Sequence, residues 1–218
     1  MIHGITLALD GSTYSGSVAV IQDGVVLAER ELPPADKPGR SGRDENFMPM
    51  VAAALSAAGV EPREIDRIVC GEGPGSFTSL RIAASIAKGI AVGVGCPLFS
   101  VSSLVLMVAD RTPGRYLATL PAMRGERFAL LVDVGRDGGI ESDAPVIVAE
   151  SSIDSYAAER GATHVEGRPH AAAMRPILRW IIAAGARNID SWEPTYGRLA
   201  EAQVKWEATH GRPLPATG

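Results

Sequence analysis

The alternation of apolar and polar positions divides the first part of the chain into three strands. Runs rich in β-branched residues predict strands over 2–10, 17–22 and 25–31. Asp23-Gly24, between the second and third runs, is a favoured two-residue hairpin turn. The chain therefore opens with three antiparallel strands, and Asp10 stands at the end of the first.

The pattern then changes to helical spacing. Residues 45–58 predict a helix that Gly59 ends. Its apolar stripe consists of Phe47, Val51, Ala54, Leu55 and Ala58. Met48 and Met50 lie off this stripe, and two interpretations stay open: ordinary core positions, or an apolar helix face that a partner covers.

The rest of the chain is organised around a glycine-rich stretch, residues 71–78, with the sequence Gly-Glu-Gly-Pro-Gly-Ser-Phe-Thr. A strand is predicted before it, over 65–70, and an apolar helix after it, as far as Gly95. In a strand, glycine loop and helix of this order, backbone N–H groups converge on an anion or close onto a partner. The alternative is a tight turn without a ligand. Ser76 or Thr78 is expected to cap the helix, which begins near Phe77.

The second half begins at a boundary near 111–115, after a strand at 98–101 and a helix from Ser102 or Ser103 to about Ala109. Further strands are predicted over 116–122, 127–134, 146–149 and 163–166, and further helices over 151–160, 174–184 and 198–209. Each half thus opens with strand, turn and strand and then adds helices.

Composition narrows the class of protein. A formal net charge of −4 and a pI near 5.6 argue against a protein that grips nucleic acid by itself. Cys70 and Cys96 stand in apolar segments without C-x-x-C spacing, which predicts buried, reduced thiols and a cytosolic protein. The first residues do not have the pattern of a signal peptide. The apolar run at 82–98 contains Lys88 and several glycines, so a core helix is favoured over a membrane span.

The first candidate for chemistry is Asp10-Gly11-Ser12-Thr13. A carboxylate beside small hydroxyl residues and free N–H groups can hold a nucleotide's phosphates and a magnesium ion. The alternative, which the tetrapeptide alone favours, is a turn in which Asp10 accepts hydrogen bonds from its own backbone. None of the four histidines pairs at i, i+4 with another, so a helical zinc site is not encoded. No histidine is placed by sequence to activate Ser76 as a nucleophile.

Several segments together resemble the TsaB (YeaZ) family, bacterial subunits of the machinery that makes threonylcarbamoyladenosine in tRNA. The resemblance is dense over 5–104 and thinner afterwards. It rests on the segments 5–20, 73–82, 87–91 and 97–104, and later on 124–128 and 194–198. The chain departs from the family pattern at several positions: Ser79 replaces a glycine, Gly11 replaces a threonine, and Gly39 to Arg43 stand where a histidine is often found.

The resemblance implies an α/β protein with the actin-like ATPase (ASKHA) fold, built from two half-domains of RNase-H-like topology. The first lobe would span 1–110, with the glycine loop and the interface helices, and the smaller second lobe 111–218. Pro121 stands where the family shows an acidic residue, which argues against a second phosphate or metal contact at this turn.

The resemblance also implies a non-catalytic scaffold or activator subunit in the cytoplasm, with no catalytic residues, no metal and no membrane association. Its partners would be TsaD, in a heterodimer, and the ATPase TsaE, with a homodimer in isolation and tRNA reached through the complex. No cofactor is required, and ATP or ADP is a candidate ligand at the subunit interface. The alternatives are a stand-alone kinase or ATPase of this fold and, least favoured, a metallopeptidase, as the family's glycoprotease-like label suggests.

The implied partner interface comprises the glycine loop and one face of the helix behind it. Its members are Gly73, Pro74, Gly75, Ser76, Phe77, Thr78, Leu80, Arg81, Ala84, Ala87, Lys88 and Ala91. The small residues of this helix would let another helix approach closely. The alternative is a helix wholly buried in its own domain.

Overall fold

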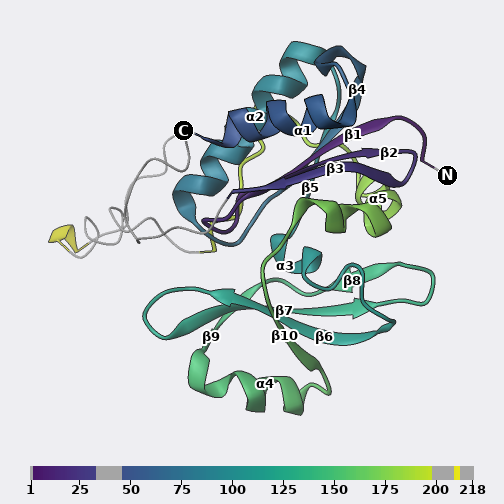
Figure 1. Cartoon of the computed structure of the whole chain (residues 1–218). Helices are drawn as coiled ribbons and strands as arrows, with labels where there is room; N and C mark the ends of the chain where they lie inside the picture. Colours follow the sequence, from purple (N-terminus) through teal and green to yellow (C-terminus); the bar gives the residue numbers. More distant parts are fainter. Residues whose placement is uncertain (1, 33–45, 198–208, 212–218) are drawn as a thin grey trace.

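Two mixed β-sheets form the framework of the molecule (Figure 1). The computed structural model describes residues 2–32, 46–197 and 209–211. In the first sheet the strand order is β3-β2-β1-β4-β5. Its strands are β1 (Ile5–Asp10), β2 (Ser17–Gln22), β3 (Val25–Glu31), β4 (Ile65–Gly71) and β5 (Leu98–Val101). The first three pair antiparallel, as the hairpin pattern predicts, and β4 and β5 run parallel to β1.

Two helices, α1 (Phe47–Ala58) and α2 (Phe77–Val94), cover one face of this sheet (Figure 1). Leu7 and Leu9 point toward these helices, whereas Ala8, between them, belongs to the core on the opposite face. The predicted stripe of α1 is confirmed, because Phe47, Val51, Ala54 and Leu55 are buried and Ala58 is partly buried. Gly59 ends the helix in the left-handed conformation. Met50 is buried and Met48 is half exposed.

The second sheet has the order β10-β6-β7-β8, and β9 also pairs with β7. Its strands are β6 (Gly114–Pro121), β7 (Glu126–Val134), β8 (Ile140–Ser142), β9 (Val146–Ala149) and β10 (Thr163–Glu166). Helix α4 (Ile153–Glu159) covers its outer face, and α3 (Ser103–Leu106) and α5 (Met174–Ala183) lie between the two sheets (Figure 1). The structure also has the short 3-10 helices η2 (Pro62–Glu64), η3 (Glu150–Ser152) and η4 (Ala171–Ala173).

One apolar core joins the two sheets. It contains Ile21 and Phe99 from the first sheet, Leu120 and Leu130 from the second, and Ile177 from α5. The chain also returns to the first sheet after leaving the second, since the amide of Arg187 donates to the Leu98 carbonyl at 2.7 Å. The division into lobes at residue 110 stays a prediction. Any such division must allow for the residues near Arg187, which follow the second sheet in the sequence but bond to the first.

The structure differs from the prediction at two elements. The helix expected to reach Ala109 ends at Leu106, because the chain continues in turns, with hydrogen bonds between residues three apart such as Val108 N–H to Val105 O. Strand β8 was not predicted, since three residues with one buried side chain, Ile140, carry no periodic signal. The expected helix over 198–209 and the Gly39–Arg43 departure lie outside, or almost wholly outside, the described residues.

Helix α2 is, within the described part of the chain, the one helix long and apolar enough to cross a membrane by length and composition. One third of its 18 residues are buried in the structure. Core helices of soluble proteins also meet this criterion of length and composition. Cys70 and Cys96 are free and buried, as predicted.

An ion pair ties the segment before α5 to the edge strand of the first sheet. His170 Nδ1 lies 3.2 Å from Glu29 Oε1, and the same carboxylate oxygen accepts from the Ala172 amide at 3.3 Å. The hydrogen bond to Glu29 raises the pKa of His170, and the same bond lowers the pKa of the Glu29 carboxyl. The pair therefore favours the charged form of both groups.

This pair predicts a pH-dependent contribution to stability. The contribution of His170 is fully present below its unfolded pKa and is lost as the pH rises through the raised folded value. The contribution of Glu29 is present above its unfolded pKa and is lost as the pH falls through the lowered folded value. Glu29→Gln should thus reduce the free energy of unfolding more at pH 5.5 than at pH 8, by about 0.5 kcal/mol, since solvent screens a half-exposed pair.

Urea denaturation of both proteins at the two pH values measures this difference. Glu141→Gln, an exposed position of β8, serves as the matched control and should show no such pH dependence. An equal effect of Glu29→Gln at both pH values would show that the pair contributes no net charge interaction.

Candidate functional site

Segments far apart in the sequence meet at the carboxyl ends of the parallel strands of the first sheet. They are residues 10–13 after β1, 71–78 after β4, 102–103 after β5, and 194–197 near the end of the described chain. We refer to these four segments as the motif junction. Strands β1, β4 and β5 are parallel neighbours, so the loops that follow them come together at one edge of the sheet.

Asp10 is the central polar group of the motif junction. Its Oδ1 accepts hydrogen bonds from the Ser12 amide at 3.0 Å and the Ser12 hydroxyl at 2.6 Å, and its Oδ2 accepts from the Ser103 hydroxyl at 2.6 Å. Burial raises the pKa of Asp10, and these hydrogen bonds oppose the rise. The structure therefore places Asp10 in a turn of its own backbone, the alternative that the tetrapeptide favours. Thr13 Oγ1 is buried and has no hydrogen-bond partner within the described chain.

The backbone of the glycine loop is bonded within the chain. The Ser76 amide donates to the Ser12 carbonyl at 2.7 Å, and the Gly73 amide donates to the Ser103 hydroxyl at 3.1 Å. The Gly73 carbonyl in turn accepts from the Ser103 amide at 2.9 Å. Gly73 adopts φ +94°, which favours glycine, and the Gly73–Pro74 peptide is cis. These two N–H groups of the loop are thus engaged by the chain and do not face an open anion site.

Ser76 stands at the N-cap position of α2, but its side chain does not cap the helix. The Ser76 hydroxyl donates to the Ser79 hydroxyl at 3.1 Å, and the predicted cap through Ser76 is therefore wrong. Thr78 lies within the first turn of the helix and cannot be its N-cap.

The late segment 192–197 lies across the glycine loop and the start of α2. The Thr195 amide donates to the Glu72 carbonyl at 2.7 Å, and the ring of Tyr196 lies 4.3 Å from that of Phe77. A side chain at Gly197 would lie 2.6 Å from Phe128 and 2.8 Å from Pro74. The segment 194–197 therefore contacts the glycine loop, and Phe128 of the other late motif segment lies beside Gly197. Reasoning from sequence did not assign Ser103, Thr195 or Tyr196 to the site, although each belongs to or adjoins a segment that carries the resemblance.

The predicted interface residues divide into two groups. One group is buried: Gly73, Pro74, Leu80, Ala84, Ala87 and Ala91. The other is exposed or half-buried: Gly75, Ser76, Phe77, Thr78, Arg81 and Lys88. The buried members of α2 recur at spacings of three and four: Ala84, Ala87 and Ala91 pack in the core against the first sheet, and Leu80 is buried beside Gly73. A partner cannot reach them while the chain keeps this fold. For the buried group the structure favours burial within its own domain, and for the second group the interface role stays a prediction.

A groove of about 270 Å³ runs along the exposed part of this surface. Phe77, Arg81 and Lys88 line it from α2, and Trp192 and Tyr196 line it from the late segment. Arg81 lies 5.4 Å from the centre of the Phe77 ring, and Lys88 lies 5.8 Å from that of Trp192. The groove therefore combines aromatic faces with two cations. Among the described residues, no three His, Cys, Asp or Glu side chains cluster as metal ligands.

The fold defines the general class of protein. Residues 41–133 match the family model of TsaD, tRNA N6-adenosine threonylcarbamoyltransferase. The solved structure of YeaZ from Pseudomonas aeruginosa superposes with a TM-score of 0.72 at 21% identity, over 88% of this chain and 99% of that one. The chain therefore has the actin-like (ASKHA) α/β fold, as predicted.

Two curated relatives narrow this class to a family. TsaB of Escherichia coli K12 is 40% identical over 126 residues, which cover 56% of this chain and 52% of that protein. TsaB of Bacillus subtilis is 28% identical over 232 residues, covering 92% of this chain and 96% of that protein. The chain belongs to the TsaB (YeaZ) family.

The geometry of the loop predicts opposite effects of alanine at two glycines. A Cβ at Gly75 would overlap the Ser12 carbonyl, whereas a Cβ at Gly89 on α2 meets nothing within 4 Å. Gly75→Ala should lower the free energy of unfolding by about 2–3 kcal/mol, because one backbone segment must move. Gly89→Ala should raise it by about 0.5–1 kcal/mol, the helix propensity difference. Urea denaturation measures both, and a Gly75→Ala protein as stable as the parent would contradict this packing.

The hydrogen bonds of Asp10 predict that even an isosteric amide is poorly tolerated. Asp10→Asn leaves one acceptor oxygen for three donors, so the free energy of unfolding should fall by about 1–3 kcal/mol. Asp133→Asn, in an exposed pair with Arg115, is the matched control and should change stability by no more than about 0.5 kcal/mol. Stability is measured by thermal or urea denaturation. Equal stability of the two variants would show that the hydrogen bonds of Asp10 do not stabilise the fold as expected.

Proposed function

We propose that the chain is a non-catalytic accessory subunit in the formation of threonylcarbamoyladenosine in tRNA, and that it pairs with a TsaD partner. The observation that carries this proposal is the match to TsaB of Bacillus subtilis over 92% of the chain. The name of that relative, a tRNA threonylcarbamoyladenosine biosynthesis protein, states the pathway. The proposal also includes TsaE as a further partner and a homodimer of this chain in isolation. The chain reaches tRNA through the complex and is located in the cytoplasm.

The motif junction supports a scaffold role. The carboxylate of Asp10 and the amides of Gly73 and Ser76 are engaged in hydrogen bonds within the chain. Groups held in this way fix the shape of a surface, whereas a catalytic site needs polar groups directed at a substrate. Such a role needs no cofactor. ATP or ADP is the ligand that we propose for the subunit interface.

The outward face of α2 supports a partner surface. Phe77, Thr78, Arg81 and Ser85 are exposed there, and the side chain of Val92 is 68% exposed. Gly89 and Gly93 lie on the same helix with open space beside them. An aromatic residue, an arginine and apolar groups beside small residues are typical of a surface on which another protein packs closely.

A reconstitution tests the role. The chain is combined with TsaD and TsaE of the same organism, threonylcarbamoyl-adenylate and tRNA, and the modified nucleoside is measured with and without the chain. Modification should collapse when the chain is omitted. Full modification without it, together with no complex on size exclusion, would refute the proposal.

Matched variants test the surface. Gly89→Trp places a bulky side chain on the exposed face of α2, and Ala158→Trp places the same side chain on the exposed face of α4. Gly89→Trp should weaken the complex with TsaD by about ten- to hundredfold, and Ala158→Trp should leave it unchanged. Isothermal titration calorimetry measures both, and circular dichroism verifies that each variant is folded. Equal affinities would place the partner surface elsewhere.

A further inference from the structure

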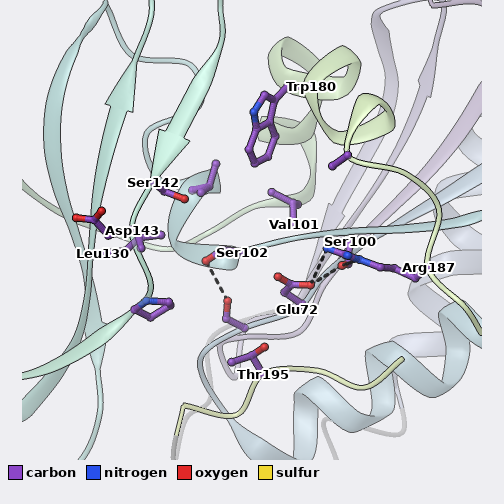
Figure 2. Close-up of a pocket in the computed structure, with 14 residues that line it drawn as sticks. Glu72, Ser100, Val101, Ser102, Leu130, Ser142, Asp143, Trp180, Arg187 and Thr195 are labelled. Carbon is purple, nitrogen blue, oxygen red and sulfur yellow. Dashed lines mark hydrogen bonds and ion pairs between the residues drawn. The ribbon is translucent and has the colours of Figure 1, made fainter. Parts of the chain in front are cut away.

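A second cavity lies between the ends of β4 and β5 and the second sheet, beside Gly73 of the glycine loop. Figure 2 shows its walls: the second sheet on one side, α5 above, and the ends of β4 and β5 on the other side. Its volume is about 190 Å³. Pockets for drug-sized ligands occupy roughly 300–1,000 Å³. The cavity is therefore too small to enclose a nucleotide and suits a small metabolite.

One wall offers the guanidinium group of Arg187. Arg187 Nε donates to the Ser100 hydroxyl at 2.7 Å, which fixes the plane of the side chain. Its Nη2 lies 3.7 Å from Glu72 Oε2, beyond hydrogen-bond distance. Nη2 thus forms a long ion pair with Glu72, and within the described part of the chain neither Nη1 nor Nη2 donates a hydrogen bond, so both can donate to a ligand's carboxylate.

The same wall offers a carboxylate. Glu72 Oε2 accepts a hydrogen bond from the Ser100 hydroxyl, so a single serine holds both charged groups in place. In Figure 2 the Glu72 side chain lies between this hydroxyl and the interior of the cavity. Asp143, an exposed residue of the connection between β8 and β9, lines the cavity too and adds a second negative charge. Carboxylates in this position favour an ammonium group.

The rest of the lining is largely apolar, with the hydroxyl residues Ser102, Ser142 and Thr195 among it. Val105 from α3, Leu130 from β7 and the Trp180 ring from α5 line the space opposite the charged pair, and Figure 2 shows Trp180 directed into it. A ligand that satisfies all three features carries a carboxylate, an ammonium group and a short apolar body. The geometry points to a binding site for a small zwitterion of the α-amino acid class, with Arg187 holding its carboxylate and Glu72 its ammonium group.

This inference is independent of the proposed function, and the full chain alone tests it. Thermal unfolding and calorimetry are recorded with L-alanine, L-serine and L-valine, and with propionate and propylamine, which carry one charged group each. The amino acids should raise the melting temperature, and each half-ligand should bind about ten- to hundredfold more weakly, because a charged hydrogen bond is lost. L-tryptophan, which exceeds the cavity, should give no shift.

Variants assign the site to the two charged residues. Arg187→Met and Glu72→Gln should each weaken amino acid binding by about ten- to hundredfold. Arg136→Met and Glu159→Gln, at exposed positions that do not line the cavity, should leave it unchanged. If a cavity variant fails to fold, the comparison of amino acids with half-ligands on the unaltered chain decides alone. Absence of any shift with the amino acids, propionate binding as tightly as L-alanine, or undiminished binding by a folded Arg187→Met protein would each overturn the inference.

Discussion

The buried hydrogen bond from the Ser103 hydroxyl to Asp10 is the interaction on which the rest of the structure depends. It joins the end of β1 to the first residue of α3, just after β5, across the intervening strand β4. Gly71 ends β4 at this point, and a Cβ there would overlap the Asp10 carboxylate. The carboxylate can be buried only because each of its oxygens receives a hydrogen bond and the strand between the two partners lacks a side chain.

This constraint explains why the glycine loop has its shape. Ser103 also bonds to both the amide and the carbonyl of Gly73, so the group that holds Asp10 holds the loop as well. The loop in turn receives the late segment through Glu72 and Thr195, and the ring of Tyr196 then lies against Phe77. A continuous series of hydrogen bonds and one ring contact therefore links the buried carboxylate to the exposed start of α2. The surface that we propose for the partner is positioned by a buried polar network several residues away.

Much of the fold could be predicted from sequence, because period-two and period-3.6 patterns reflect burial directly. The three opening strands and the stripe of α1 are examples. Short elements such as β8 could not be predicted, since pairing with β7, and not their own pattern, makes them strands. The candidate site was identified through its segments, but the partners of Asp10 and the position of Tyr196 depend on contacts between residues up to 119 positions apart, Phe77 and Tyr196. Local patterns carry no information on such contacts.

The small residues of α2 show why composition alone was ambiguous. Alanine and glycine both suggest close packing, yet the structure gives them different neighbours. Ala84, Ala87 and Ala91 let the helix lie close to its own sheet, whereas Gly89 and Gly93 face outward with nothing within 4 Å of an added Cβ. An outward glycine lowers helix stability by about 0.5–1 kcal/mol relative to alanine and gains nothing within the chain. Close approach of another backbone is the benefit that a glycine offers at such a position, so this cost favours a covered surface over a solvent-exposed one.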